Sequence, residues 1–480
     1  MSKPTPIKQT RSSVISSISE VFSSQRAAFA RDMNPSLAER IDRLDRLSAM
    51  TARIAPQLVE AMSADFGHRS PHVTRLADIA SVEADIRHNR RSLAKWMKAR
   101  RVPTALAFQP AYCRVIPQPL GVVGVVAPWN YPYQLAIGPT VAAIAAGNRV
   151  MIKPSELTPR VSELMRSAVE ASFSPEEIAV IVGDADVGKS FVALPFDHLL
   201  FTGSTEVGRQ VAVAAAANLT PVTLELGGKS PAIFHQDFSA ELDTGRLAMT
   251  KLFNAGQTCI APDYALVPRE RLSEFVAGMQ ASVSRMYPDI GSNPDYTSII
   301  NERHWQRLQA LLDDARSHGA EIISLGQRIP GGMPRMMTPA LVLNVNDDMR
   351  IMQQEIFGPL LPVMVYDTLD EMLAYVNRHP RPLALYWFGA DAGARDRVLR
   401  ETLSGGVTIN DCMWHFGQQD LPFGGVGASG MGACHGEAGF RTFSKHKPVF
   451  YQSRFSGMRL MYPPYGKVFE AVERVMKFIT

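Results

Sequence analysis

One cysteine and one glutamate stand in glycine-containing loops and together could perform covalent catalysis. Cys259 follows Asn-Ala-Gly-Gln-Thr, and Glu225 precedes Leu-Gly-Gly-Lys. A thiolate can attack carbon, and a carboxylate can later activate water. An inert buried cysteine and a salt-bridged glutamate are the ordinary alternatives. Gly256 favours close backbone approach, and a thiol at a loop-to-helix junction would have a lowered pKa, so a reactive thiol is as well supported as an inert one.

An amide upstream of this pair could stabilise negative charge. Asn130 lies between Pro128 and Pro132. An asparagine between prolines is commonly a turn residue. Its side-chain NH2 group is also a suitable oxyanion donor, which would face an alkoxide formed on a substrate. The local sequence leaves both interpretations open.

Three further segments could bind a dinucleotide. Lys153 and Glu156 follow an apolar strand, at the end where open α/β sheets bind ligands. Residues 201–208 read as a strand, a glycine turn and a helix start, whose free N–H groups suit a pyrophosphate. Glu355 stands two residues before Phe357. Each segment alone is explained equally well by an ordinary helix cap or turn, and no GxGxxG fingerprint is present.

Residues 183–190 match the phosphate-binding pattern GxxxxGK[ST], but their context argues against an ATP site. Asp184 and Asp186 would place negative charge where phosphates should lie. Pro195 leaves room for only a short helix after the motif. No suitable strand that ends in an aspartate, which would bind the metal ion of the nucleotide, follows it. We therefore reject this motif as a nucleotide site.

The elements that must position these residues alternate between strands and helices. The apolar spacing predicts helices over 36–55 and 81–98, then a β-rich stretch over 112–126 interrupted at 117–119. Strands at 149–153, 178–182 and 198–201 alternate with helices, of which one is expected over 134–146. A second βα series, with a helix over 302–318, begins after Gly228 and runs to about Gly424. Such alternation predicts an α/β fold with parallel sheets and crossover helices.

Composition excludes several classes of protein. The chain has 480 residues and a net charge of +4, with scattered basic residues, so a nucleic-acid partner is not expected. Its four cysteines form no disulfide framework or metal spacing, which fits a reducing compartment.

Residues 1–24 have no apolar signal-peptide core. The uncharged run 115–148 is broken by prolines, which disfavours a membrane span. An amphipathic helix at 468–478 favours docking on a subunit over membrane contact.

Taken together, the motifs resemble the aldehyde dehydrogenase superfamily over residues 44–447. The resemblance is closest to the short dimeric branch for aromatic and fatty aldehydes, and within it to bacterial coniferyl aldehyde dehydrogenases. The matching segments are Pro-Trp-Asn at 128–130, Lys-Pro-Ser-Glu at 153–156, Phe-Thr-Gly-Ser at 201–204, Leu-Glu-Leu-Gly-Gly-Lys-Ser-Pro at 224–231, Gly-Gln-Thr-Cys at 256–259 and Glu-Ile-Phe-Gly-Pro at 355–359.

The resemblance implies a role for each candidate. Cys259 attacks an aldehyde, Asn130 and the Cys259 backbone N–H hold the oxyanion, and Glu225 activates water to hydrolyse a thioester. No metal site is implied. The implied NAD⁺ site, with NADP⁺ as an alternative that Glu156 disfavours, involves Pro128, Trp129, Lys153, Glu156, Gly203, Ser204, Gly208, Leu226, Glu355 and Phe357.

The resemblance also predicts a division of the chain. Residues 1–98 and 119–225 are expected to form a Rossmann-like cofactor domain, and 226–424 a catalytic domain. Residues 99–118 and 425–480 are expected to form a small β element that joins the subunits of a cytoplasmic homodimer.

The sequence leaves the substrate open. The aromatic loop at 411–416, with Trp129, Tyr131 and Tyr133, suggests a pocket for an aromatic or long apolar aldehyde, although these side chains could instead pack the core. A coniferyl-type aldehyde is favoured over a medium- or long-chain aliphatic one. An acylating enzyme that uses coenzyme A is one alternative, which Glu225 disfavours because hydrolysis needs that base. A catalytically silent structural protein is another, which the presence of Cys259, Asn130 and Glu225 disfavours.

Overall fold

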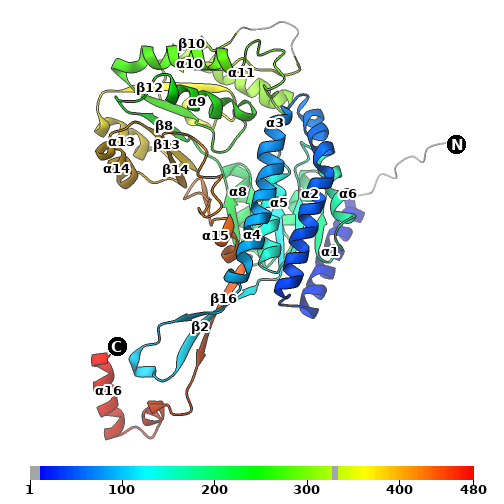
Figure 1. Cartoon of the computed structure of the whole chain (residues 1–480), viewed down its shortest axis with the longest axis vertical. Coiled ribbons are helices and arrows are strands. Elements are labelled where there is room, and N and C mark those ends of the chain that lie inside the picture. Colours follow the sequence, from blue (N-terminus) through cyan, green and yellow to red (C-terminus); the bar gives the residue numbers. More distant parts are fainter. Residues whose placement is uncertain (1–10, 327–332, 480) are drawn as a thin grey trace, which may run out of the picture.

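The computed structural model describes residues 11–326 and 333–479 and has three β-sheets (Figure 1). Two are large, mostly parallel and covered by helices, and the third is a small antiparallel sheet. The predicted α/β fold with two open parallel sheets and a small β element is confirmed. The first ten residues, which belong to the predicted cofactor domain and polar N-terminus, lie outside the described residues.

The six-stranded sheet has the order β15-β7-β6-β3-β4-β5. Its inner strands are buried on both faces, as expected for a parallel sheet between helical layers. The strands are β3 (Val122–Val126), β4 (Arg149–Lys153), β5 (Ile178–Val180), β6 (His198–Thr202), β7 (Val222–Glu225) and β15 (Gly430–Met431).

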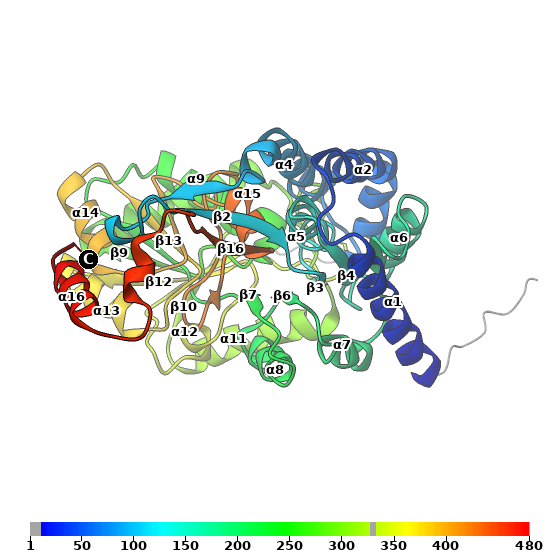
Figure 2. The same cartoon turned by 90° about the horizontal axis from the view of Figure 1, so that it is seen from below.

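Helices cover both faces of this sheet (Figure 2). One layer contains α1 (Arg11–Arg31), α7 (Ala185–Val192) and α8 (Thr205–Ala216), which pack on β3, β4, β6 and β7. The other layer contains α5 (Gln134–Ala145) and α6 (Pro159–Glu170), with α2 (Leu37–Phe66), α4 (Ser81–Trp96) and α15 (Gly436–Thr442) packed against them. Between α2 and α4 lie α3 (Pro71–Val73) and the π-helix η1 (Thr74–Ala80).

The seven-stranded sheet has the order β10-β11-β12-β9-β8-β13-β14. Only β10 is antiparallel to its neighbour. The strands are β8 (Pro231–Phe234), β9 (Tyr264–Pro268), β10 (Glu321–Ser324), β11 (Ala340–Leu343), β12 (Leu360–Tyr366), β13 (Ala384–Phe388) and β14 (Gly406–Ile409).

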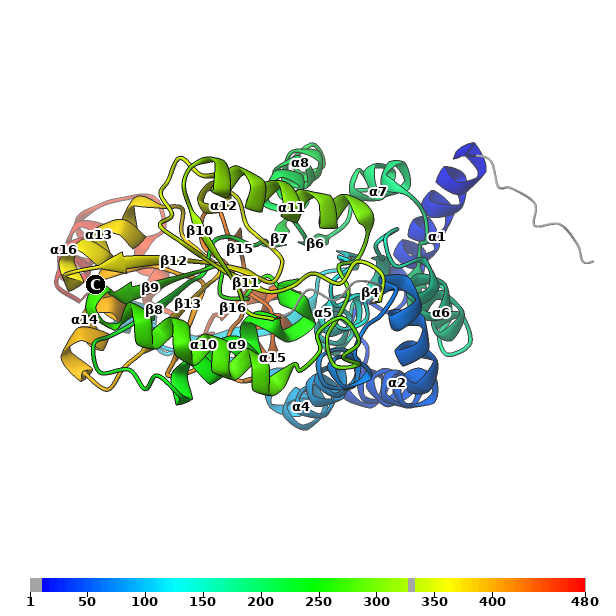
Figure 3. The ribbon, with the colours of Figure 1, turned by 90° about the horizontal axis from the view of Figure 1, so that it is seen from above.

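Helices also lie on both sides of the second sheet (Figure 3). Helices α9 (Leu242–Leu252) and α10 (Leu272–Met286) cover one face, and α11 (Glu302–Ser317) lies on the other. The remaining elements of this part are η3 (Phe253–Gly256), η4 (Arg269–Arg271), α12 (Arg350–Gln353), α13 (Leu369–Arg378) and α14 (Ala392–Glu401).

The small sheet forms an arm that projects from the body (Figure 1). It contains β1 (Arg100–Val102), β2 (Tyr112–Pro119) and β16 (Ser444–Tyr451), with β2 in the middle. Strand β2 continues through Pro117, so the predicted interruption at 117–119 is wrong. Strand β1 pairs only with residues 113–115, so both prolines lie beyond its end, where β2 has one free edge. The arm also carries η2 (Leu106–Phe108), η5 (Gly457–Met461) and α16 (Lys467–Ile479).

The predicted helix over 36–55 is longer than expected, because α2 continues past Pro56 to Phe66. Leu58, Met62 and Phe66 are fully buried on its last turns. Their packing compensates for the hydrogen bond that a proline removes from a helix interior. The helix begins with a capping box between Ser36 and Glu39.

Among the described residues, no helix has the length and apolar character that crossing a membrane requires. The uncharged run at 115–148 is divided between β2, β3 and α5. Among all residues that the structure describes, no cluster of histidine, cysteine or acidic side chains could hold a metal ion.

Candidate active site

The Cys259 loop packs backbone to backbone against the loop that carries Glu355. Asn254 and Ala255 have φ values of 53° and 52°, and Gly256 has a φ of 75°. A Cβ atom on Gly256 would lie 2.3 Å from the Gly358 carbonyl oxygen, so this contact requires glycine. Three consecutive left-handed residues hold the turn before Cys259 in a defined, strained shape.

Asn130 is locked to this loop by hydrogen bonds on both ends of the residue. Its Nδ2 donates to the Gln257 carbonyl at 3.1 Å, which leaves a second N–H on the same amide. Its own carbonyl accepts from Asn254 Nδ2 of this loop at 3.2 Å and from Arg69 Nη1 at 2.8 Å. Arg69 is fully buried and pairs with the buried Asp78 at 2.7 Å. The ion pair thereby fixes the backbone that presents the Asn130 amide.

Glu225 ends β7 and is 4% exposed. Its Oε1 accepts a hydrogen bond from Cys434 Sγ at 3.5 Å, and its Oε2 has no hydrogen-bond partner among the described residues. Burial raises the pKa of Glu225 to about 8, and the Cys434 contact opposes that shift. A carboxyl group with such a pKa can take up or release a proton near neutral pH.

The surroundings of Cys259 raise its pKa to about 12, through burial first and then through the nearby carboxylates of Glu355 and Glu225. The sequence suggested a lowered pKa if the thiol stood at a helix start. In the structure, Cys259 is followed by turns and no helix begins there, so no helix dipole stabilises a thiolate. The thiol is therefore protonated at neutral pH.

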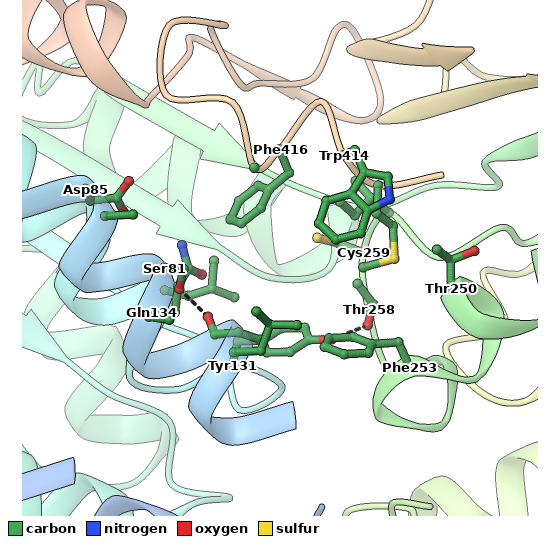
Figure 4. A pocket seen from close by; sticks show the side chains of 18 of the residues that line it. Ser81, Asp85, Tyr131, Gln134, Thr250, Phe253, Thr258, Cys259, Trp414 and Phe416 are labelled. Carbon is green, nitrogen blue, oxygen red and sulfur yellow. Dashed lines mark hydrogen bonds between the residues drawn. The ribbon is translucent and has the colours of Figure 1, made fainter. Parts of the chain in front are cut away.

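Cys259 opens onto a cavity of about 290 Å³ with a mostly apolar lining. Trp414 and Phe416 of the 411–416 loop lie on one side of the thiol, and Tyr131 and Phe253 lie on the other (Figure 4). The polar groups Asp85, Gln134 and Gln419 also line the cavity, at the side of α4 and α5. A flat or extended apolar molecule of modest size fits such a space.

A second and smaller cavity of about 40 Å³ joins Cys259 to Glu225. Its lining includes Asp85, Cys434 and His435, and it has room for one or two water molecules. The two candidate catalytic groups therefore face one space, although they come from different sheets. The structure brings together the thiol, the carboxylate and the Asn130 loop that the sequence singled out.

Lys153 and Glu156 lie at the carboxyl end of β4, as predicted. Lys153 is buried, and its Nζ donates to the Pro154 carbonyl at 2.8 Å. Burial lowers the pKa of Lys153, and the Glu156 and Asp184 carboxylates oppose that shift. Glu156 itself is exposed. A buried cation beside an exposed acid at this strand end suits ribose hydroxyls.

Residues 203–208 form the turn from β6 into α8. Ser204 caps the helix by accepting from Val207 N at 3.4 Å. A Cβ on Gly208 would lie 2.6 Å from Leu226 Cδ2, so a small residue is needed where α8 meets the end of β7. Gly203 donates its N–H to the Glu225 carbonyl at 3.0 Å. The glycine turn and helix start fit a nucleotide phosphate, and α8 is long enough to support one.

The remaining cofactor-binding candidates, Pro128, Trp129, Glu355 and Phe357, form a cluster of aromatic and acidic residues near Cys259. Trp129, the residue after Pro128, packs edge-to-face on Phe357 at 5.4 Å and also contacts His304. Phe357 has a φ of 50°. The Glu355 carboxylate lies against the backbone of Gly227 and Gly228, and burial raises its pKa to about 8. In this position it also raises the pKa of Cys259.

The predicted aromatic pocket is only partly correct. Tyr131 lines the cavity, and its hydroxyl pairs with Thr258 at 2.6 Å. Tyr133 is fully buried and bonds to Thr51 at 2.7 Å, so it belongs to the core. Trp129 packs on Phe357 and does not line the cavity. The side chains of Trp129, Tyr131 and Tyr133 have different surroundings because the chain turns into α5 at this loop.

The rejected motif at 183–190 forms the start of α7. The Asp184 side chain accepts from the N–H groups of Asp186 and Val187 at 3.0 and 3.1 Å. These are the amides that would otherwise face an anion. The aspartate cap therefore takes the place that a phosphate would need.

Several residues of the site carry no sequence signal. Asp85 lies on α4, and burial raises its pKa to about 7. Cys434 and His435 follow a glycine-rich segment at 424–430 and line the smaller cavity. Lys251 lines neither cavity, but it is a fully buried lysine that interacts electrostatically with Glu355, and burial lowers its pKa to about 8. Nothing in the local sequence of these residues distinguishes them from ordinary surface or core positions.

Two doubly covered α/β sheets, with a half-buried thiol and a buried carboxylate between them, define an enzyme fold suited to covalent catalysis on an apolar substrate. The chain belongs to the aldehyde dehydrogenase family, whose family model matches residues 3–449.

Relatives and solved structures agree with this assignment. A "Probable coniferyl aldehyde dehydrogenase" of Pseudomonas aeruginosa is 51% identical over 94% of each chain. The substrate-bound structure of Staphylococcus aureus AldH has a TM-score of 0.90 and 36% identity, covering 96% of this chain and 99% of that one. A P. syringae indole-3-acetaldehyde dehydrogenase variant in complex with NAD⁺ and IAA has a TM-score of 0.83 and 25% identity, covering 92% and 89%.

Proposed function

We propose that the protein oxidises an aromatic aldehyde of the coniferyl type to its carboxylic acid, with NAD⁺ as the preferred oxidant. The observation that carries this proposal is the shared space between Cys259 and Glu225, next to a larger apolar cavity. The names of the relatives support an aldehyde as substrate, and the P. aeruginosa relative supports the coniferyl type.

The first step is attack of the Cys259 sulfur on the aldehyde carbon. The thiol must lose its proton, and its raised pKa means that a base has to accept that proton. The Glu225 and Glu355 carboxylates are the nearby candidates. The aldehyde oxygen becomes an alkoxide, which the free N–H of the Asn130 amide and the Cys259 backbone N–H stabilise.

Bound NAD⁺ would supply the acceptor for the hydride that leaves the substrate carbon. In the proposed site, Lys153, Glu156 and Glu355 would hold the riboses. The 203–208 turn and Leu226 would hold the pyrophosphate, and Pro128, Trp129 and Phe357 would hold the nicotinamide. The exposed Glu156 carboxylate would repel a 2′-phosphate, which favours NAD⁺ over NADP⁺.

The last step is hydrolysis of the thioester on Cys259. Glu225 accepts a proton from water through Oε2, and the water oxygen attacks the acyl carbon. The carbon–sulfur bond breaks, the acid leaves, and the sulfur regains a proton. The smaller cavity beside Glu225 has the volume that this water needs.

The mostly apolar lining of the large cavity favours an aromatic or extended aldehyde over a small polar one. Trp414 and Phe416 can face an aromatic ring, while Asp85, Gln134 and Gln419 provide hydrogen bonds for a ring hydroxyl. A medium- or long-chain aliphatic aldehyde is the second candidate, because the mostly apolar cavity lining also suits an alkyl chain.

The decisive assay measures NAD(P)H at 340 nm with purified protein, NAD⁺ or NADP⁺, and coniferaldehyde, benzaldehyde and octanal. We expect the highest kcat/KM with coniferaldehyde and NAD⁺, and no dependence on coenzyme A. A higher kcat/KM with octanal would replace the aromatic proposal by the aliphatic one. Absence of NAD(P)H with every aldehyde would refute the dehydrogenase activity.

A further inference from the structure

The buried cysteine nearest to Glu225 has no role in the reaction described so far. We infer that Cys434 is a positioning residue, whose S–H group holds Glu225 Oε1 so that Oε2 faces the hydrolytic water. The inference rests on the proposed function of Glu225 as the base for hydrolysis. It concerns only the release of an acyl group from Cys259 and is independent of which aldehyde supplies that group.

The first support is geometric. Cys434 Sγ donates to Glu225 Oε1 at 3.5 Å, within the longer range that sulfur allows. This is the one side-chain hydrogen bond to the Glu225 carboxylate among the described residues, since Oε2 has no partner. Both residues are buried and both line the small cavity that reaches Cys259. Without the S–H contact, no side-chain hydrogen bond in the described chain would orient this carboxylate.

The second support is the way the chain delivers Cys434 to this place. Strand β15 pairs with β7 so that Gly430 lies opposite Glu225. A Cβ on Gly430 would lie 2.1 Å from the Leu224 carbonyl oxygen, so the two strands pack as closely as glycine allows. Four residues later, Cys434 exchanges two backbone hydrogen bonds with Phe423, at 2.7 and 2.9 Å. Both ends of the segment are therefore fixed, and the thiol has little freedom to move away.

The electrostatic surroundings give the expected direction of the effect. The titratable groups that line the small cavity with Glu225 are Asp85 from α4, Cys259, Cys434 and His435. Burial lowers the pKa of His435 to about 4, and burial together with Glu225 raises the pKa of the Cys434 thiol. Both groups are therefore neutral near pH 8. Donation from a neutral thiol favours the ionised form of Glu225, so removing the donor should raise the pKa of Glu225.

The test isolates hydrolysis from the redox step. p-Nitrophenyl acetate is used to acetylate Cys259 without any nicotinamide, and intact-protein mass spectrometry follows the loss of the acetyl group between pH 6 and 10. The wild type is compared with Cys434→Ala, which removes the donor, and with Cys434→Ser, which retains a donor on a shorter side chain. Cys113→Ser, on strand β2 of the arm, is the matched control.

We expect deacetylation to be about tenfold slower in Cys434→Ala at pH 7, because a base that is no longer oriented loses part of its catalytic advantage. The pH range over which its deacetylation rate rises should also move to higher pH. Cys434→Ser should lie between the alanine variant and the wild type, and Cys113→Ser should match the wild type.

Equal deacetylation rates and an unmoved pH range of rising rate in Cys434→Ala would overturn the inference. A merely structural role of Cys434 would lower the melting temperature and slow acetylation and deacetylation alike, without moving the pH range over which deacetylation rises. That result would also overturn the inference. Failure of the dehydrogenase proposal has a different signature, since it appears as absence of NAD(P)H with aldehydes while deacetylation remains measurable.

Discussion

At the scale of single residues, the site combines a thiol and two carboxylates that all resist ionisation. Burial raises the pKa of Glu225 and Glu355 to about 8 each, and their negative charges in turn help to raise the pKa of Cys259 to about 12. The Cys259 thiol is therefore neutral in the free protein at neutral pH. In the proposed mechanism, a neighbouring carboxylate has to accept its proton when the substrate binds.

Replacing Glu225 by glutamine should separate acylation from hydrolysis. Glutamine has nearly the same shape but cannot accept the proton of the attacking water, so steady-state turnover should fall by about 10²–10³-fold. An acyl-enzyme on Cys259 should then accumulate and be visible by mass spectrometry after mixing with NAD⁺ and aldehyde. In the wild type, hydrolysis should rise with pH up to about 8, because Glu225 acts as a base only when ionised. Unchanged turnover in Glu225→Gln would remove this residue from the mechanism.

The reactivity of Cys259 should depend on Glu355. The alkylation rate with iodoacetamide should keep rising up to pH 10, because the thiol has a pKa of about 12. At pH 9 the Glu355 carboxylate is largely ionised, so Glu355→Gln removes a negative charge and should speed alkylation several-fold. Peptide mapping identifies the alkylated residue, and Cys259→Ala is the blank. A rate plateau below pH 8 would contradict the raised pKa.

At the scale of elements, the loop after β14 supplies aromatic side chains to the lining of the large cavity. Trp414 is 49% exposed at the rim, and Phe416 lies further along the cavity lining. Both side chains depend on the turn that starts after Ile409, in which Asn410 and Met413 have positive φ values. Such a turn places two aromatic side chains in one wall without a supporting helix.

Trp414→Ala should therefore weaken binding of aromatic aldehydes. Loss of a ring contact of about 1 kcal/mol should raise KM for coniferaldehyde about fivefold, with kcat changed less. Leu421→Ala is the matched control, because Leu421 is 47% exposed near the same loop but does not line the cavity. If both variants have the same KM, Trp414 does not contact the substrate.

At the scale of the whole molecule, the arm carries apolar side chains that the packing of the body does not bury. Figure 1 shows β2 and β16 leading away from the body to η5 and α16. Its large apolar side chains are exposed, among them Phe455 at 89% and Tyr465 at 67%. Apolar surface of this kind is unusual on a free monomer and supports the predicted homodimer.

Phe455→Glu should weaken that dimer. A charge placed within an apolar subunit contact is costly to desolvate, so the dissociation constant should rise at least tenfold. Light scattering after size-exclusion chromatography measures the mass. Val213→Glu is the control, since Val213 is 75% exposed on α8 of the body. A monomeric wild type would contradict the dimer, and equal behaviour of both variants would remove Phe455 from the contact.

The order of strands and helices could be read from the sequence because each element has its own apolar period. Strand β4, helix α5 and helix α11 begin where the pattern predicts. The pattern failed where distant contacts override a local signal. Helix α2 passes through Pro56 because its last turns are buried, and β2 passes through Pro117 because β1 ends before it.

The sequence by itself determined the α/β architecture and the candidates Cys259, Glu225 and Asn130, because residue types and glycine spacing are local properties. Only the tertiary structure decided that Cys259 has a raised pKa, that Tyr133 is a core residue, and that Cys434 contacts Glu225. Desolvation and side-chain contacts depend on which segments meet in space. Cys434 and Glu225 are 209 positions apart, and they meet because β15 returns to pair with β7.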